Sequence, residues 1–293
     1  MADKKILYLD CSSGISGDMT LAALLDLGID EETFRQELKK IDFGGYELEI
    51  KKVNHRCIEM MDVDVILESE KGHEHSHDNG HSHSHEHSHD HEHSHGHEHS
   101  HSHEHSHDHN HIHNHTHKHE HRNLQMITEL VEGSKISDNA KVIGLKIFGE
   151  IARAEGLVHG KPVDQVHFHE VGAVDSLVDI MGVAICLDML GIEEIYASPL
   201  HEGSGSIMCQ HGMLPVPVPA VSAILAGSNI PVIQEDVFTE LITPTGAGIA
   251  KCMVKSFGQM PPMMIEKIGY GHGKRDTGLL GAVRAFVGTL YEC

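Results

Sequence analysis

Basic side chains are scarce in this sequence. Its 293 residues include 22 lysines and arginines against 44 aspartates and glutamates, which gives a formal net charge of −22 at pH 7. A chain with such an excess of acid is repelled by phosphate backbones and by anionic lipid surfaces. We therefore expect neither nucleic acids nor membranes among its partners.

Close-spaced cysteine pairs and long apolar runs are also missing. Because the cysteines are scattered singly along the chain, neither a zinc knuckle nor a disulfide framework is indicated. The apolar run near the amino terminus ends at Asp10, which is too early for a signal peptide. No uncharged stretch approaches the roughly 20 residues that span a membrane. These absences predict a soluble protein of the reducing cytoplasm.

One segment has almost no apolar side chains. Between His73 and His121 histidine occupies every odd position except Asn79, giving 24 histidines. Such a composition cannot offset the entropy cost of ordering, so we expect a disordered loop inserted into the folded part. Neutral imidazole binds nickel, copper and zinc, so the tract is expected to be a reservoir of weak metal sites. A purification tag or a pH-responsive spacer is the alternative. The first predicted ligands are His73, His75, His77, His81, His83 and His85.

Two histidines and three carboxylates fall within residues 166–179, which read VHFHEVGAVDSLVD. Strand side chains alternate between two faces, so a strand over 163–171 would place His167 and His169 on the same face. A turn at 172–173 would follow, with Asp175 as the N-cap of a helix that Gly191 ends. The stretch therefore predicts a polar cluster at a strand-to-helix corner.

The next apolar run, 192–200, predicts another strand. A strand, a crossover helix and a strand form a parallel βαβ unit, and ligands bind where the carboxyl ends of parallel strands meet. Asp10 ends a first buried strand over 5–9 and would reach the same edge. We expect His169, Glu170 and Asp175 to be the catalytic residues there. The predicted metal ligands of this edge are Asp10, Asp18, His167, His169, Glu170, Asp175, His201 and Glu202.

Alternatives stay open for several of these side chains. Asp18 can simply cap the helix predicted over 19–27, and the motif histidines can be a buried, hydrogen-bonded pair. For isolated histidines a structural role is at least as good an interpretation as a functional one; these are His55, His159, His211 and His272.

Loops of small residues precede two predicted helices. Residues 10–18 read DCSSGISGD, and residues 240–248 read ELITPTGAG. Backbone N–H groups at a helix amino terminus bind phosphate, although neither loop matches a Walker loop or a dinucleotide fingerprint. A basic loop near 273–276 adds a plausible anion contact. The predicted nucleotide or phosphate contacts are Ser13, Gly14, Ser16, Gly17, Thr243, Thr245, Gly246, Lys274 and Arg275.

The predicted fold class is α/β, with a parallel-containing sheet built from βαβ units and a smaller α+β part. Residues 1–72 and 122–256 would form the α/β domain, into which the tract 73–121 is inserted. Residues 257–293 would form a carboxy-terminal strand pair, with pairing to 46–67 as one option. Helices are expected near 31–40, 123–132 and 138–155, and strands over 46–53 and 61–67.

Five motifs together resemble the LarC nickel-insertion family: LDCSSGISGDM (9–19), HFHEVGAVDS (167–176), SPLHEG (198–203), TPTGA (243–247) and GYG (269–271). The resemblance runs along essentially the whole chain, and the tract corresponds to a variable insertion of the family. It implies CTP-dependent insertion of nickel into pyridinium-3,5-bisthiocarboxylic acid mononucleotide. In this cyclometallation nickel–carbon and nickel–sulfur bonds form, and the product is the nickel-pincer cofactor of lactate racemase.

Longer members of that family continue beyond the position of Cys293 into a carboxy-terminal domain associated with CTP binding. The resemblance therefore implies that this chain is the amino-terminal, nickel-handling part, either made separately or cut from a longer protein. It would act as a nickel chelatase of the lyase class together with that domain, which would hold most of the CTP and its Mg²⁺ or Mn²⁺. Further expected partners are the mononucleotide, a lactate racemase-type apoenzyme and other copies of the chain.

Two functions from other classes remain open. The chain can be a non-catalytic nickel store or metallochaperone, in which case loss of the tract removes the function. A His/Asp/Glu cluster at a sheet edge also suits a metal-dependent hydrolase, which would cleave simple phosphate esters.

Overall fold

The computed structural model describes residues 4–67, 122–166, 168, 173–209 and 211–291. The histidine tract and the motif residues His167, His169 and Glu170 lie outside these ranges. Within them, a large mixed sheet and a set of helices form the α/β architecture that the sequence predicts. No helix among the described residues is both long and apolar enough to cross a membrane.

Seven strands form the main sheet in the order β2-β3-β10-β11-β1-β4-β9. Their bounds are β1 Lys5–Asp10, β2 Tyr46–His55, β3 Ile58–Leu67, β4 Glu194–Ala197, β9 Val254–Phe257, β10 Met263–His272 and β11 Ala282–Leu290. The pairs β2–β3, β10–β11 and β1–β11 are antiparallel, whereas β1–β4, β4–β9 and β3–β10 are parallel. The two predicted hairpin pairs are therefore present, and β10 joins β3.

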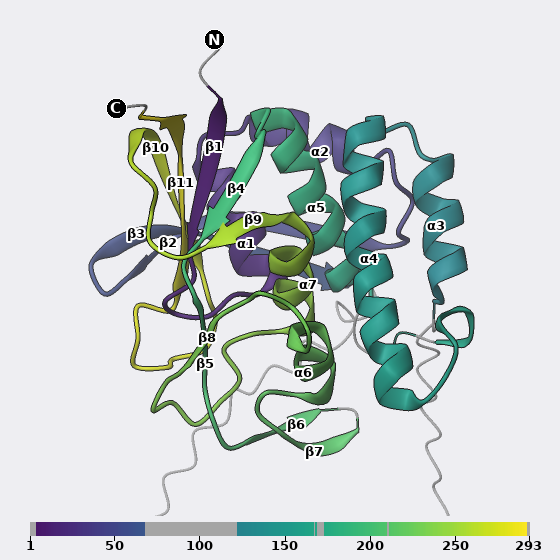
Figure 1. Cartoon of the computed structure of the whole chain (residues 1–293). Coiled ribbons are helices and arrows are strands. Elements are labelled where there is room, and N and C mark those ends of the chain that lie inside the picture. The colour runs from purple at the N-terminus through teal and green to yellow at the C-terminus, as the bar shows by residue number, and fades with distance from the viewer. Residues whose placement is uncertain (1–3, 68–121, 167, 169–172, 210, 292–293) are drawn as a thin grey trace, which may run out of the picture. The chain divides into compact units, whose positions relative to one another are not determined.

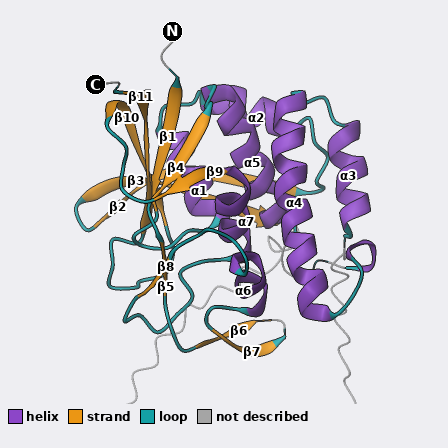
Figure 2. Cartoon of the chain, viewed as in Figure 1, coloured by secondary structure: helices purple, strands orange, loops and turns teal. Residues whose placement is uncertain are grey.

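The helices gather beside the sheet, which Figure 2 shows by colour (Figure 1, Figure 2). Their bounds are α1 Gly17–Asp26, α2 Glu31–Leu38, α3 Leu124–Gly133, α4 Asp138–His159, α5 Val174–Leu190, α6 Pro219–Leu225 and α7 Pro244–Met253. Helix α1 packs on β10 and β3, α5 packs on α1, and α4 packs on α5. Because α5 is apolar on nearly all sides and is buried at Leu177, Val178 and from Ile180 to Leu187, it forms the centre of the core.

Two small sheets complete the chain. Strand β5 (Leu200–Glu202) pairs in parallel with β8 (Val232–Gln234), and β6 (Ser206–Cys209) forms an antiparallel hairpin with β7 (Gly212–Pro215). In Figure 1 both lie at the end of the molecule where α6 is found. This is the end at which β1, β4 and β10 have their carboxyl ends.

The strand predicted over 163–171 is wrong for the residues that the structure describes. Val163–Gln165 form a 3₁₀ turn, and the N–H of Phe168 donates to the carbonyl of Arg122 instead of to a strand. Val166 and Phe168 are both buried, as the alternation predicts. Over so few residues, a period of two indicates which side chains face the core but does not require a strand partner.

The boundaries around α5 also differ from the prediction. The helix begins after Ala173, whose side chain caps nothing, and Asp175 lies within its first turn. Gly191 ends it in the left-handed conformation, as predicted. The following run is divided at Ser198–Pro199, so that β4 lies in the main sheet whereas His201 and Glu202 lie in the separate strand β5.

Candidate functional site

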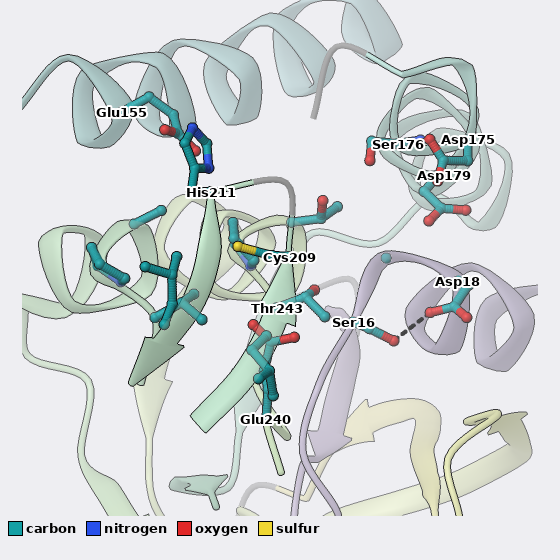
Figure 3. Close-up of a pocket in the computed structure, with 18 of the residues that line it drawn as sticks. Ser16, Asp18, Glu155, Asp175, Ser176, Asp179, Cys209, His211, Glu240 and Thr243 are labelled. Atoms are coloured by element: carbon teal, nitrogen blue, oxygen red, sulfur yellow. Dashed lines mark hydrogen bonds between the residues drawn. The ribbon is translucent and has the colours of Figure 1, made fainter. Parts of the chain in front are cut away.

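A cavity of about 690 Å³ opens at the carboxyl-end edge of the sheet (Figure 3). Its walls come from the first turns of α1, α5 and α7, the last turn of α4, the β6–β7 hairpin, β3 and the loop after β10. A smaller cavity of about 240 Å³ shares six of its lining residues. The volume is in the usual range for a small-molecule site.

The two small-residue loops lie side by side at this cavity. The N–H of Ile15 donates to the carbonyl of Leu241 over 2.9 Å, and the N–H of Thr243 donates to the carbonyl of Ile15 over 3.1 Å. Ser16 caps α1 and Thr243 caps α7, so both helices point their amino termini towards the cavity. Among the predicted nucleotide contacts, Ser16, Gly17, Thr243, Thr245, Lys274 and Arg275 line the main cavity, and Ser13 lines the smaller one.

Three carboxylates line one end of the cavity, which we call the acidic wall: Asp18, Asp175 and Asp179. Asp175 and Asp179 lie one turn apart on α5, and Asp18 on α1 lies across from them (Figure 3). Burial raises the pKa of Asp179 well above its ordinary value, and the charges of Asp18 and Asp175 raise it further. Burial is also the main cause of a raised pKa at Asp175. The carboxyl groups of Asp175 and Asp179 therefore hold protons more tightly than carboxyl groups in water.

Two cationic side chains face the carboxylates. Lys274 lies 3.7 Å from Asp18 and forms a closer ion pair with Asp64. Burial alone would lower the pKa of Lys274, but these acids outweigh it and raise the pKa. Arg275 donates to the Glu240 carbonyl over 2.9 Å and lies 3.3 Å from the Glu240 carboxylate.

The charge balance of the cavity favours cations. Five carboxylates line it, against the two cationic side chains of Lys274 and Arg275. Both cations are paired with acids, so they neutralise part of the negative charge, and the cavity as a whole keeps an excess of acid. A positively charged ring or a divalent metal ion is the kind of ligand that such a cavity attracts.

An imidazole wall lies at the other end of the cavity, made of Glu155 and His159 on α4 and of Cys209 and His211 on the β6–β7 hairpin. The ring centroids of His159 and His211 are 5.2 Å apart. The Nε2 atom of His159 lies 3.3 Å from the Glu155 carboxylate. The structure thus brings together two histidines that are isolated from each other in the sequence.

Three other predicted metal ligands lie outside the cavity lining. Asp10 forms an ion pair with Arg284; burial opposes its ionisation, but the hydrogen bonds from Arg284 and Ser12 outweigh it and hold its pKa below the ordinary value. His201 Nδ1 lies 2.5 Å from a Glu235 carboxylate oxygen. The expected convergence of His201 and Glu202 with Asp175 is therefore wrong, because β5 leaves the main sheet.

Glu202 makes structural contacts instead. Its Oε1 accepts hydrogen bonds from the N–H groups of Gly203, Leu241 and Ile242, over 2.9, 2.8 and 3.2 Å. Its Oε2 is buried without a hydrogen-bond partner, and burial is the main cause of its raised pKa. Glu202 thus fixes the loop that carries Glu240 and Thr243 into the cavity.

We expect Glu202→Ala to lower the free energy of unfolding by about 1–3 kcal/mol, since it leaves buried N–H groups without an acceptor. Chemical denaturation followed by circular dichroism measures this. His201→Ala, one position away, removes the partly exposed ion pair with Glu235. It should lower the free energy of unfolding by less than about 1 kcal/mol. Equal losses in the two variants would contradict the structural role of Glu202.

No group of three or more histidine, cysteine or acidic side chains in the described part of the chain is arranged to hold a metal ion. Whether any predicted residue ligates a metal therefore stays a prediction, and His167, His169, Glu170 and the tract histidines lie outside the described ranges.

Sequence reasoning missed several of the lining residues. Asp179 follows Asp175 by four positions, a helical spacing that would have indicated a second carboxylate on the same face. Glu240 is the first residue of the small-residue loop 240–248, which the sequence predicts to contact phosphate. No sequence signal indicated Val63 and Val65, which reach the cavity because β3 extends beyond the end of β10.

Several known proteins similar to this chain are named as nickel insertion proteins. A family model described as "Nickel insertion protein" matches residues 7–292. A pyridinium-3,5-bisthiocarboxylic acid mononucleotide nickel insertion protein of Acetivibrio thermocellus is 47% identical over 288 residues, which cover 98% of this chain and 61% of that protein. Proteins of the same name from Lactiplantibacillus plantarum and Clostridium acetobutylicum are 46% and 45% identical, over 95% and 97% of this chain and 60% and 64% of theirs. The chain thus spans about three-fifths of the length of these relatives. No solved structure matches the chain significantly.

Proposed function

The chain belongs to the nickel insertion protein family, and we propose that it takes part in inserting nickel into pyridinium-3,5-bisthiocarboxylic acid mononucleotide, the reaction for which its relatives are named. The observation that supports this function best is the acid-rich cavity at the sheet edge. Ni²⁺ is a divalent cation, and an excess of carboxylates attracts it.

The reaction that we propose includes a proton transfer. A nickel–carbon bond would form at a ring carbon as the carbon–hydrogen bond there breaks; the electron pair of that bond stays on carbon and becomes the bond to nickel, hydrogen leaves as a proton, and nickel stays divalent. The released proton needs an acceptor. Asp179 is suited to this role because its side chain lines the cavity and because burial and the neighbouring carboxylates raise its pKa.

The mononucleotide phosphate would lie near the paired loops. The hydroxyl groups of Ser16 and Thr243 and the side chains of Lys274 and Arg275 line both cavities, so a phosphate there meets donors from both loops. With the phosphate in the smaller cavity, the ring would extend into the main one and reach the acidic wall.

Other parts of the proposal rest on the resemblance. His169 and Glu170, together with Asp175, remain our candidates for handling the metal beside the substrate. We further propose that CTP with Mg²⁺ or Mn²⁺ is required and is bound mainly by a carboxy-terminal LarC-type domain. A lactate racemase-type apoenzyme and further copies of the chain remain the expected partners, and the cytoplasm the expected location.

The test is an insertion assay on the purified chain. The chain is incubated with the dithiolated mononucleotide, Ni²⁺, CTP and Mg²⁺, with and without a separately expressed carboxy-terminal domain, and the nickel adduct is detected by mass spectrometry. We expect product when the domain is present and none without it. No product in either reaction, combined with nickel release to an added chelator, would overturn the proposal in favour of a nickel store.

A further inference from the structure

The imidazole wall joins metal-binding groups from two elements that are distant in sequence. Glu155 and His159 lie one turn apart in the last turns of α4, and His211 lies in the turn between β6 and β7. Figure 3 shows His211 and Glu155 close together, on the side of the cavity away from Asp18, Asp175 and Asp179. The fold, and not a sequence motif, creates this group.

The two walls differ in the metals that they suit. Carboxylate oxygens are typical ligands of Mg²⁺ and Ca²⁺, whereas imidazole nitrogens favour nickel, copper and zinc. A nickel ion that enters the cavity therefore meets better ligands at the imidazole wall. The excess of carboxylates around the cavity favours the entry of any divalent cation, so local charge and ligand type act together.

The contact between Glu155 and His159 has the form found around metal-binding histidines. In such sites a carboxylate commonly accepts a hydrogen bond from one ring nitrogen, which orients the ring and makes its other nitrogen a stronger ligand. The 3.3 Å distance between the Glu155 carboxylate and His159 Nε2 fits this arrangement. The His211 ring, 5.2 Å away between centroids and tilted by 42°, supplies a second imidazole.

We propose that His159 and His211 are the two protein ligands of a receiving site for a divalent transition metal, with Glu155 as the residue that orients His159. The site deepens the proposed nickel insertion and rests on it. With two protein ligands, water molecules would complete the coordination of the metal. Two protein ligands leave positions open for the sulfur atoms of the incoming substrate, as a transfer site requires.

A matched control lies elsewhere in the same chain. His55 and His272 have ring centroids 5.3 Å apart, and Asp62 lies 3.1 Å from His272 Nδ1. This second group has the same composition of two imidazoles and one carboxylate, but it is not part of the cavity lining. If paired histidines alone were enough, both groups would bind metal equally well.

The test measures nickel binding by residues 1–293 with every tract histidine changed to serine, so that the tract does not mask other sites. Equilibrium dialysis gives the number and affinity of bound Ni²⁺, and the visible spectrum of bound Co²⁺ reports the ligands. We expect the double variant His159→Ala/His211→Ala to bind one Ni²⁺ less per chain, or to bind it at least 100-fold more weakly. The double variant His55→Ala/His272→Ala should bind as the parent does.

Unchanged nickel binding in His159→Ala/His211→Ala would overturn the proposal, as would an equal loss in the His55→Ala/His272→Ala variant. If the first variant melts at a lower temperature than its parent, the more conservative double variant His159→Gln/His211→Asn replaces it, with the same expected loss of nickel binding. Glu155→Gln, which keeps a hydrogen-bonding side chain, should weaken nickel binding about 10- to 100-fold without removing the site. Insertion activity is measured separately. If the His159→Ala/His211→Ala variant keeps both nickel binding and insertion activity, only this site is refuted. If the parent binds nickel but inserts none, the proposed function is refuted.

Discussion

Changing Gly246 to alanine is expected to lower the free energy of unfolding by about 3 kcal/mol, at the upper end of the usual cost of overpacking. A Cβ atom at this position would lie 2.2 Å from the carbonyl oxygen of Ile15. That carbonyl belongs to the junction between the two small-residue loops, so the loops would have to separate. We therefore also expect the variant to lose substrate binding at the cavity.

Gly149→Ala is the matched control for this change. Gly149 lies inside α4, and a Cβ there would meet nothing within 4 Å. Alanine has a higher helix propensity than glycine, so the free energy of unfolding of this variant should rise by about 0.5–1 kcal/mol. Urea denaturation of the parent and both variants measures the difference. If Gly246→Ala were as stable as the parent, the close junction between the loops would be wrong.

The change Asp179→Asn is expected to slow nickel insertion by about 10²- to 10⁴-fold, the usual effect of removing a positioned base. Asparagine has nearly the shape of aspartate but cannot take up the proton. The variant should still fold and should still bind Ni²⁺ at the imidazole wall. Asp188→Asn is the control, because Asp188 lies on the same helix but contacts Ser137 and Asn139 outside the cavity lining. Equal insertion rates for Asp179→Asn and the parent would rule out Asp179 as the base.

The stability of the same variant should depend less on pH than that of the parent. Burial, followed by the charges of Asp18 and Asp175, raises the pKa of Asp179 in the folded state. Between the unfolded and the folded pKa the folded protein holds a proton that the unfolded chain has lost. The contribution of Asp179 to stability therefore decreases as the pH rises through this interval. Asparagine removes this slope, which melting temperatures measured at a series of pH values would reveal.

Local patterns predicted most of the secondary structure but not all of its pairing. The hairpin strands β2 and β3, the apolar helix α5 and its end at Gly191 follow from alternation, from a long apolar run and from the left-handed preference of glycine. The alternation of Val166 and Phe168 with polar residues predicts a strand before α5. That pattern indicates which side chains are buried. A strand also needs a hydrogen-bonded neighbouring strand, and the sequence of one segment does not show whether such a neighbour exists.

The candidate site was predicted in outline. Small-residue loops before helices indicated Ser16, Asp18 and Thr243, which line the cavity because helix amino termini gather at the carboxyl-end edge of such sheets; their binding roles stay predictions. His201 was misplaced because the break at Ser198–Pro199 directs the chain out of the main sheet. The partnership of His159 with His211 depends on how α4 and the β6–β7 hairpin pack against each other. Such packing depends on tertiary contacts and has no local signal in the sequence.

The position of β1 in the sheet has a consequence for synthesis. On one side β1 pairs with β11, where Lys5 lies opposite Thr289, and on the other side it pairs with β4. At about 5–20 residues per second, a ribosome needs roughly 15–60 s to reach β11 after it has made β1. During this time the apolar strand has an unpaired edge, and the hairpin β2–β3 forms without it. Final closure of the sheet must then join β1 and β11, which are far apart in the sequence, so we expect this step to be slow and to follow the synthesis of β11.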